Sequence, residues 1–235
     1  MDLSKGRLLS PLFPSECACC GMPVEGGTLI CEECREGLLS PEPPLCPFCG
    51  AGVSRCGCRG NTPYDILVSP FYYKGPVKDG IRRIKFLRRE DSAVFFGREM
   101  GRTVNERLFG YEFDILAPVP ASREKLMERG FNQSLSMAEE MRIENGKKRP
   151  VLDPGLLKKR EGTEIKREKT RSGRKELVKG SFVLGRGRNV SGKRILLVDD
   201  ILTTGATAGE CATVLKLHGA SFVAVVCAAV PFRDL

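Results

Sequence analysis

The chain has 235 residues, of which 41% are hydrophobic and 29% charged, and its formal net charge is +9 at pH 7. This balance is typical of a globular protein with one or two domains, and no segment approaches the length of an apolar membrane span. Residues 1–15 lack the apolar stretch of a signal peptide, so we expect a cytoplasmic protein with no membrane span. The positive charge favours anionic partners, such as phosphorylated ligands, nucleic acid or acidic proteins, without selecting one of them.

Cysteine is concentrated near the start of the chain. Nine of the eleven cysteines lie between Cys17 and Cys58. Clustered thiols in a cytoplasmic protein are more often metal ligands than disulfides, so this concentration predicts a separate metal-binding module. We place a double zinc ribbon at residues 1–62 and a second domain at residues 63–235. Because the first segment has few large apolar side chains, metal rather than a core would hold it together.

The cysteines form two groups whose spacing suits four-thiolate zinc sites, so two structural zinc ions are expected. The first group is Cys17, Cys20, Cys31 and Cys34, and the second is Cys46, Cys49, Cys56 and Cys58. The pair Cys56 and Cys58 departs from the two-residue spacer of the other pairs. Cys19 is a surplus thiol, which is either a spare or a replacement for Cys17 or Cys20.

The next segment predicts a strand followed by a helix. Residues 66–73 read as a β-strand, and residues 77–89 have the periodicity of an amphipathic helix. Its apolar face carries Val77, Ile81, Ile84 and Leu87, and the basic residues outside that face are Lys78, Arg82, Lys85 and Arg89. We interpret these basic residues as a solvated helix face, with a nucleic-acid surface as the alternative.

A second strand is predicted at residues 114–120, where an apolar run stops at prolines. It delivers Ala121, Ser122 and Arg123 to its carboxyl end. Small residues followed by a cation suit a diphosphate, so we predict that these three residues bind substrate. An amphipathic helix should follow and end at Asn145-Gly146. The apolar positions of that helix are Phe131, Leu135, Ala138 and Met141.

A strongly basic segment runs from Lys158 to Lys175, with nine basic and three acidic residues. Few apolar side chains interrupt it. It is interpreted either as a mobile loop near the site, able to act as a lid, or as a solvated charge run.

The most informative segment covers residues 195–207. Four branched apolar residues predict a buried parallel strand, and Asp199 and Asp200 follow at its carboxyl end. Ligands of open parallel sheets bind beyond the carboxyl ends of the strands, and helix N-termini bind anions, so the segment suits a phosphorylated sugar. The carboxylates would accept hydrogen bonds from the ribose hydroxyls, and the following turn would bind the phosphate. That turn consists of Thr203, Thr204, Gly205, Ala206 and Thr207.

A helix after this turn and an apolar strand at residues 222–230 complete the pattern. Strand, helix and strand at this spacing predict a right-handed parallel crossover. The expected fold class is therefore α/β, with a doubly wound parallel sheet preceded by the small zinc-binding module.

The segment 195–207 resembles the phosphoribosyl diphosphate (PRPP) motif of type I phosphoribosyltransferases: an apolar strand, two acidic residues, two further residues, then Thr-Thr-Gly-Ala-Thr. The resemblance implies that fold, binding of PRPP with Mg²⁺, and catalytic roles for Asp199 and Asp200. Enzymes that salvage 6-oxopurines typically carry an aspartate where this chain has Thr203. A threonine cannot serve as a base at neutral pH, so a 6-oxopurine acceptor is disfavoured.

The cysteine module and the PRPP motif together resemble the ComF family of competence proteins over almost the whole chain. Further shared marks are Pro118-Val119-Pro120, Arg129-Gly130-Phe131-Asn132-Gln133 and Gly180-Ser181-Phe182. The chain departs from the family where Lys166 and Leu177 replace a glutamine and an asparagine in the stretches Thr163-Glu164-Ile165-Lys166 and Arg174-Lys175-Glu176-Leu177.

The resemblance implies a PRPP-binding protein that transfers phosphoribose to an unknown acceptor. The alternative is a non-catalytic adaptor of DNA uptake that senses PRPP or a nucleotide. Such an adaptor would bind single-stranded DNA or a helicase partner.

Overall fold

The structure is a computed structural model, and it describes residues 15–25, 27–87, 90–144, 146, 148–160, 166–170, 173–177 and 180–234. At its centre is a parallel sheet with the strand order β1, β10, β9, β3, β4, in which β2 also pairs with β10. The strands are β1 (Ile66–Val68), β2 (Phe71–Tyr72), β3 (Ile115–Pro118), β4 (Val151–Leu152), β9 (Arg194–Ile201) and β10 (Phe222–Val230).

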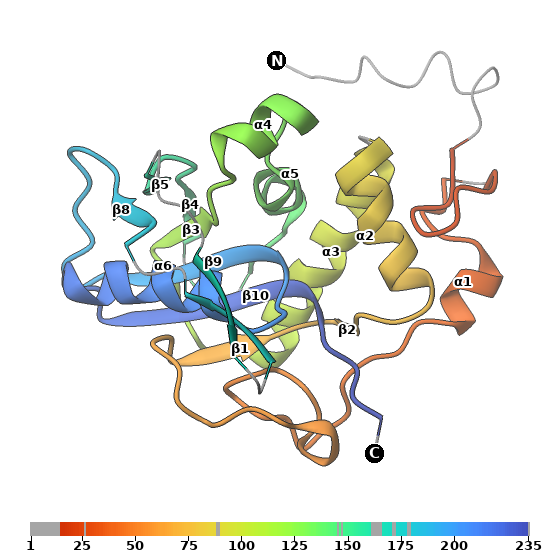
Figure 1. Cartoon of the computed structure of the whole chain (residues 1–235). Helices are drawn as coiled ribbons and strands as arrows, with labels where there is room; N and C mark the ends of the chain where they lie inside the picture. Colours follow the sequence, from red (N-terminus) through yellow and green to blue (C-terminus); the bar gives the residue numbers. More distant parts are fainter. Residues whose placement is uncertain are drawn as a thin grey trace, which may run out of the picture.

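Helices cover both faces of the sheet (Figure 1). One face packs against α2 (Pro76–Leu87), α3 (Glu90–Arg107) and α5 (Gln133–Glu140), and the other against α6 (Ala206–Leu217). Side chains alternate along a strand, so Leu196 and Val198 of β9 join the core under the first face while Ile195 and Leu197 join the core under the second. The predicted doubly wound α/β fold is confirmed.

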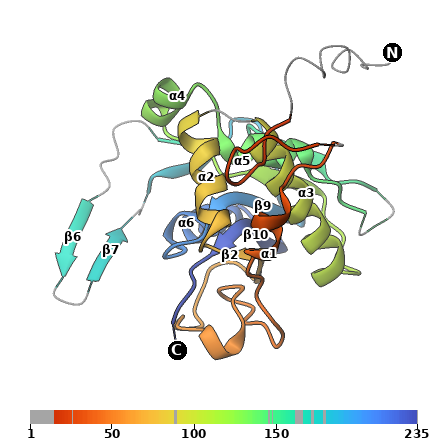
Figure 2. The same ribbon diagram turned by 90° about the vertical axis from the view of Figure 1, so that its right-hand side faces the viewer.

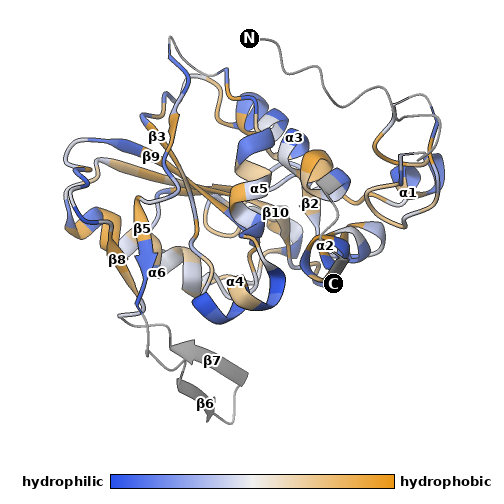
Figure 3. Ribbon diagram, turned by 90° about the horizontal axis from the view of Figure 1, so that it is seen from above, coloured by the Kyte–Doolittle hydropathy of each residue, from blue (hydrophilic) through white to orange (hydrophobic). Residues whose placement is uncertain are grey.

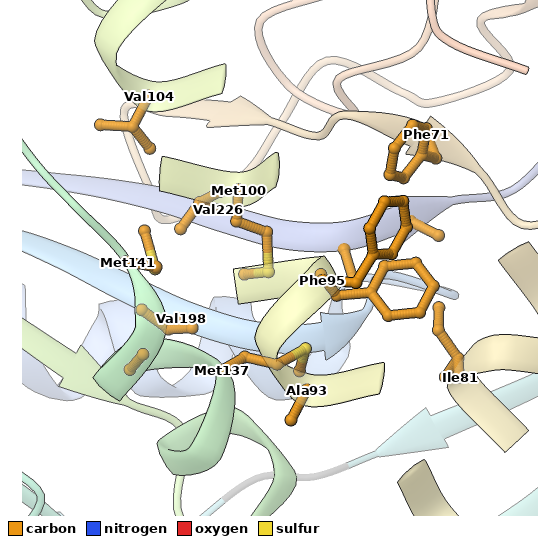
Figure 4. Close-up of a cluster of buried hydrophobic side chains, with 14 of the residues drawn as sticks. Phe71, Ile81, Ala93, Phe95, Met100, Val104, Met137, Met141, Val198 and Val226 are labelled. Carbon is orange, nitrogen blue, oxygen red and sulfur yellow. The ribbon is translucent and has the colours of Figure 1, made fainter. Parts of the chain in front are cut away.

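Helix α3 is absent from the sequence-based predictions. Its residues Ala93, Met100 and Val104 are buried in the same hydrophobic core as Val198 and Val226 of the central strands (Figure 4). These helix positions are seven and four residues apart, which is the spacing of a buried helical face.

Two glycines let α3 approach α5 closely. A Cβ atom on Gly97 would collide with the backbone oxygen of Met137, and one on Gly101 would lie 2.8 Å from the backbone nitrogen of Arg142. Any larger side chain at either position would force the two segments apart.

Two predicted elements are shorter in the structure. The strand predicted at residues 66–73 is divided into β1 and β2 at Ser69-Pro70, where proline cannot donate a ladder hydrogen bond. Helix α5 begins after Asn132, whose side chain accepts a hydrogen bond from the Ser134 backbone, and it ends before Met141 rather than at Asn145-Gly146. Figure 3 shows the hydrophobic residues along β3 and the hydrophilic ones over much of the short helix α4 (Arg123–Arg129).

The basic segment contains strands where a loop was predicted. β5 (Leu157–Lys159) pairs with β8 (Phe182–Leu184) in an antiparallel arrangement. β6 (Lys166–Thr170) pairs with β7 (Gly173–Leu177), also antiparallel (Figure 2). Thr163, Glu164 and Ile165, part of the departure from the family pattern, lie outside the described residues.

The cysteine-rich segment packs on two sides of the sheet domain (Figures 1 and 2). The first ribbon, which carries the cysteine group from Cys17 to Cys34, contains α1 (Glu32–Glu36) and lies beside α2 and α3. Its buried Cys19 and Ile30 join the same core as these helices. The second ribbon, which carries the cysteine group from Cys46 to Cys58, contains a 3-10 turn (Val53–Arg55). It lies beside β1 and the end of the chain, where Arg55 Nη1 donates to the Arg233 carbonyl. Among the described residues, no helix is long and apolar enough to cross a membrane.

Candidate functional site

The predicted site residues lie at the carboxyl ends of β3 and β9, where the order in which the chain adds strands to the sheet reverses. Adjacent strands β3 and β9 are parallel and pair Pro118 with Val198. From β3 the chain passes through α4 and α5 to β4, and from β9 it passes through α6 to β10 on the opposite side. Ligands of doubly wound sheets bind at such a switch point, beyond the carboxyl ends of the strands. This arrangement brings residues 121–123 and 199–207 to one edge.

Asp199 is buried at the end of β9. Its side chain is only 9% exposed, and its Oδ1 accepts hydrogen bonds from the Ser134 hydroxyl at 3.4 Å and from the Asp200 backbone at 2.9 Å. Burial, together with the neighbouring charge of Asp200, raises the pKa of Asp199 from 3.8 to about 7. Near neutral pH this carboxyl is therefore present in both its neutral and its charged form.

Asp200 forms an ion pair with a helix that the sequence did not connect to the site. Its Oδ2 lies 2.5 Å from Lys85 Nζ of α2, and its Oδ1 accepts a hydrogen bond from the Ile201 backbone at 2.7 Å. The interpretation of Lys85 as part of a solvated face is wrong, because its side chain is only 21% exposed. Lys85 borders the apolar stripe, next to Ile84, and this flanking position is the only trace of the contact in the sequence.

The turn after β9 presents the start of α6 to the site. The Leu202 N–H donates to Ala229 of β10, which anchors the turn. Gly205 has φ +75° and precedes α6, and it has no side chain that could cap the helix. The backbone N–H groups of a first helical turn can bind an anion. Thr203 and Thr204 are exposed, and the Thr204 hydroxyl oxygen accepts from the Ala206 N–H at 3.3 Å.

The loop after β3 is held by hydrogen bonds from two helix caps. The Ser122 hydroxyl oxygen accepts from the Lys125 N–H and caps α4, while Asn132 caps α5 and donates from Nδ2 to the Val119 carbonyl at 3.0 Å. Ala121 and Ser122 are half-buried and Arg123 is exposed. The stretch around Asn132, noted in the sequence for its family resemblance, therefore has a structural role at this edge.

The cysteines form two compact clusters. The Sγ atoms of Cys17, Cys20, Cys31 and Cys34 lie within 4.8 Å of one another, and so do those of Cys46, Cys49, Cys56 and Cys58. The Sγ separations of 3.7 Å for Cys20 and Cys31 and 3.6 Å for Cys49 and Cys56 fit a tetrahedron with zinc–sulfur bonds of about 2.3 Å. Cys19 is buried outside both clusters.

Comparisons with known proteins agree with this geometry. The family model "Double zinc ribbon domain" matches residues 8–65. The "DNA utilization protein YhgH" of Escherichia coli K12 is 29% identical over 224 residues, which cover 91% of this chain and 96% of that protein. "Competence protein ComFC" of Bacillus subtilis is 28% identical over 189 residues, which cover 76% of this chain and 74% of that protein.

A search of solved structures matches a purine phosphoribosyltransferase from Pyrococcus horikoshii at 19% identity and a TM-score of 0.31, covering 60% of this chain and 73% of that chain. The parallel sheet, its switch point and the two cysteine clusters define a double zinc ribbon joined to a doubly wound α/β domain. Relatives named as competence or DNA utilization proteins match the chain over most of its length, so the chain is similar to the ComF family of competence proteins.

The raised pKa of Asp199 predicts a pH-dependent cost of keeping it ionised. The Asp199 carboxyl binds its proton more tightly in the folded chain than in the unfolded chain. Protonated Asp199 therefore adds to the free energy of unfolding, and this contribution declines as pH rises from about 4 to about 7. Asp199→Asn removes the charge. We expect its stability relative to the wild type to be roughly 2 kcal/mol greater at pH 7.5 than at pH 5.5 in urea denaturation without magnesium. The exposed Asp79→Asn is the control, and an equal difference at both pH values would refute the prediction.

Proposed function

We propose that the chain binds PRPP at the edge formed by β3 and β9 and transfers its phosphoribosyl group to a nucleophilic acceptor. The observation that carries this proposal is the acid pair at the end of β9, followed after a short turn by the start of α6, at the switch point of the sheet. A carboxylate pair suits a diol, and a helix N-terminus suits a phosphate. A phosphorylated ribose satisfies both with one ligand.

Each part of the site has a distinct role in this proposal. Asp199 and Asp200 would accept hydrogen bonds from the ribose 2′- and 3′-hydroxyls, and residues 203–207 would bind the 5′-phosphate. Residues 121–123, on the adjacent strand end, would bind the diphosphate, which Mg²⁺ would accompany as a hard, oxygen-seeking cation.

In the transfer, the bond between the anomeric carbon and the diphosphate oxygen breaks as the acceptor's bond to that carbon forms. Diphosphate leaves with the bonding electron pair, and the acceptor loses its proton to solvent. By analogy with glycoside chemistry, positive charge develops on the sugar ring. The site residues contribute by positioning and by electrostatic stabilisation. Thr203 supplies no base, which disfavours a 6-oxopurine acceptor.

Binding of Mg²⁺-PRPP by calorimetry tests the site. Asp200→Asn keeps the side-chain shape and removes the charged acceptor, so we expect affinity at least about tenfold lower than in the wild type. Asp234→Asn, an exposed acid near the end of the chain, is the matched control and should bind as the wild type does. Absence of wild-type binding, or unchanged binding by Asp200→Asn, would overturn the assignment. Release of diphosphate in the presence of candidate acceptors then separates an enzyme from a binding protein.

A second candidate function is favoured by the relatives. Their names refer to competence and DNA utilization, and this chain carries a net charge of +9. In that case the chain is a non-catalytic adaptor of DNA uptake that senses PRPP or a nucleotide and binds single-stranded DNA or a helicase partner. Contact with a strand would depend mainly on phosphates, because the sequence has no tryptophan and the cysteine module has few aromatic residues for base stacking.

Direct strand binding can be tested with a fluorescent single-stranded oligonucleotide. Affinity should fall by an order of magnitude or more between about 50 and 200 mM salt, because phosphate contacts release counterions. A peptide nucleic acid of the same base sequence, which has no phosphates, is the control and should not bind. If the oligonucleotide has no affinity at low salt, direct DNA binding is wrong and only the partner-binding form of the adaptor survives.

We also propose that each cysteine cluster holds one structural zinc ion. Cys20→Ser removes one thiolate from the first cluster, so the purified chain should lose one of its two zinc equivalents and unfold locally around residues 15–37. Cys19→Ala changes the neighbouring buried thiol that lies outside the cluster, and it should retain both ions. Metal content by mass spectrometry decides: loss of zinc in Cys19→Ala, or full content in Cys20→Ser, would contradict the ligand assignment.

A further inference from the structure

Helix α2 connects the first ribbon to the acid pair. Near its end, Arg83 Nη2 lies 2.5 Å from Glu16 Oε2 of the ribbon, and Lys85 Nζ lies 2.5 Å from Asp200 Oδ2. Residues two positions apart on a helix point in nearly opposite directions. One helical turn therefore contacts the ribbon with one side chain and the phosphoribosyl site with the other.

The contact with the ribbon is close as well as charged. A Cβ atom on Gly80 would lie 3.0 Å from the Ala18 carbonyl oxygen, and that oxygen accepts a hydrogen bond from Ser92 at 2.7 Å. Ala18 lies between Cys17 and Cys20, and Glu16 directly precedes Cys17. The turn that carries two thiols of the first cluster is thus fastened to α2 and to the start of α3.

The positive charge of Lys85, beside the acid pair, affects how a phosphorylated ligand can bind there. Two adjacent carboxylates repel a phosphorylated ligand, and a nearby cation reduces that repulsion. The Lys85 and Asp200 side chains are only 21% and 20% exposed, so solvent screens their interaction less than it would at the surface. An ammonium held here can also contact anionic oxygen atoms of a ligand whose diol binds Asp200.

We propose that Lys85 is a positioning residue of the phosphoribosyl site, and that the first ribbon controls its placement through α2. The affinity for PRPP then depends on the metal-bound fold of the first ribbon, although no cysteine touches the ligand. This proposal rests on the proposed function, because it names a regulator of the same site.

A double-mutant cycle tests the connection. Lys85→Gln should weaken Mg²⁺-PRPP binding about tenfold and Glu16→Gln about threefold, because the first removes the cation and the second only loosens the helix that carries it. In the double variant, affinity should be no lower than in Lys85→Gln alone. Glu32→Gln, an exposed acid of the same ribbon that pairs with Arg35, is the matched control and should bind normally. Zinc content is measured for every variant and should stay unchanged.

Hydrogen exchange provides a readout that requires no ligand. Glu16→Gln should speed exchange in peptides covering residues 76–87 and 199–206, whereas Glu32→Gln should leave both unchanged. The coupling is wrong if Glu16→Gln leaves both peptides unchanged, or if its effect on affinity adds fully to that of Lys85→Gln. If Glu16→Gln speeds exchange as expected but the wild type binds no PRPP, the proposed function fails, and with it the role of Lys85 toward the ligand. The mechanical link through α2 would still stand.

Discussion

Strand β9 is buried on both faces and hydrogen-bonded to a neighbouring strand on each side, and the rest of the structure depends on this constraint. Its residues Ile195–Val198 are fully buried, and its backbone pairs with β10 on one side and β3 on the other. A strand held in this way cannot shift by one residue without moving its apolar side chains to the wrong layer. The acid pair at its end is therefore held in register with the loop after β3, and Asp199 is buried at the border of the core.

The two ribbons reach different halves of this edge. The first reaches Asp200 through α2 and Lys85. The second reaches the helix start through Tyr64, whose hydroxyl donates to the Phe48 carbonyl at 2.8 Å and lies 3.3 Å from the position that a Cβ of Gly205 would occupy. Cysteine clusters far from the site in sequence thus support the two ligand-facing segments from behind.

The sequence predicts the elements whose signal is local and misses those that depend on contacts. β9, β10 and α6 are found because branched apolar runs and a helix start are visible within a few residues. Helix α3 is missed because Gly97 and Gly101 disfavour an isolated helix by about 1 kcal/mol each, yet the close approach to α5 requires them. The structure gathers the cysteines into the two predicted groups, whereas the partner of Asp200 lies more than a hundred residues away and follows no periodicity.

The structure also resolves an electrostatic difficulty that the sequence raises. Two adjacent carboxylates should repel a ligand that carries phosphate groups, yet the same segment presents both to the same edge. Asp199 has a pKa raised to about 7, so near neutral pH a large share of it is uncharged. Asp200 is paired with the ammonium of Lys85. Burial thus favours the neutral form of Asp199, and Lys85 offsets the charge of Asp200, while both residues keep oxygen atoms that can accept hydrogen bonds. Neutralisation of this kind depends on burial for one carboxylate and on a distant helix for the other, so it is a property of the fold and not of the motif alone.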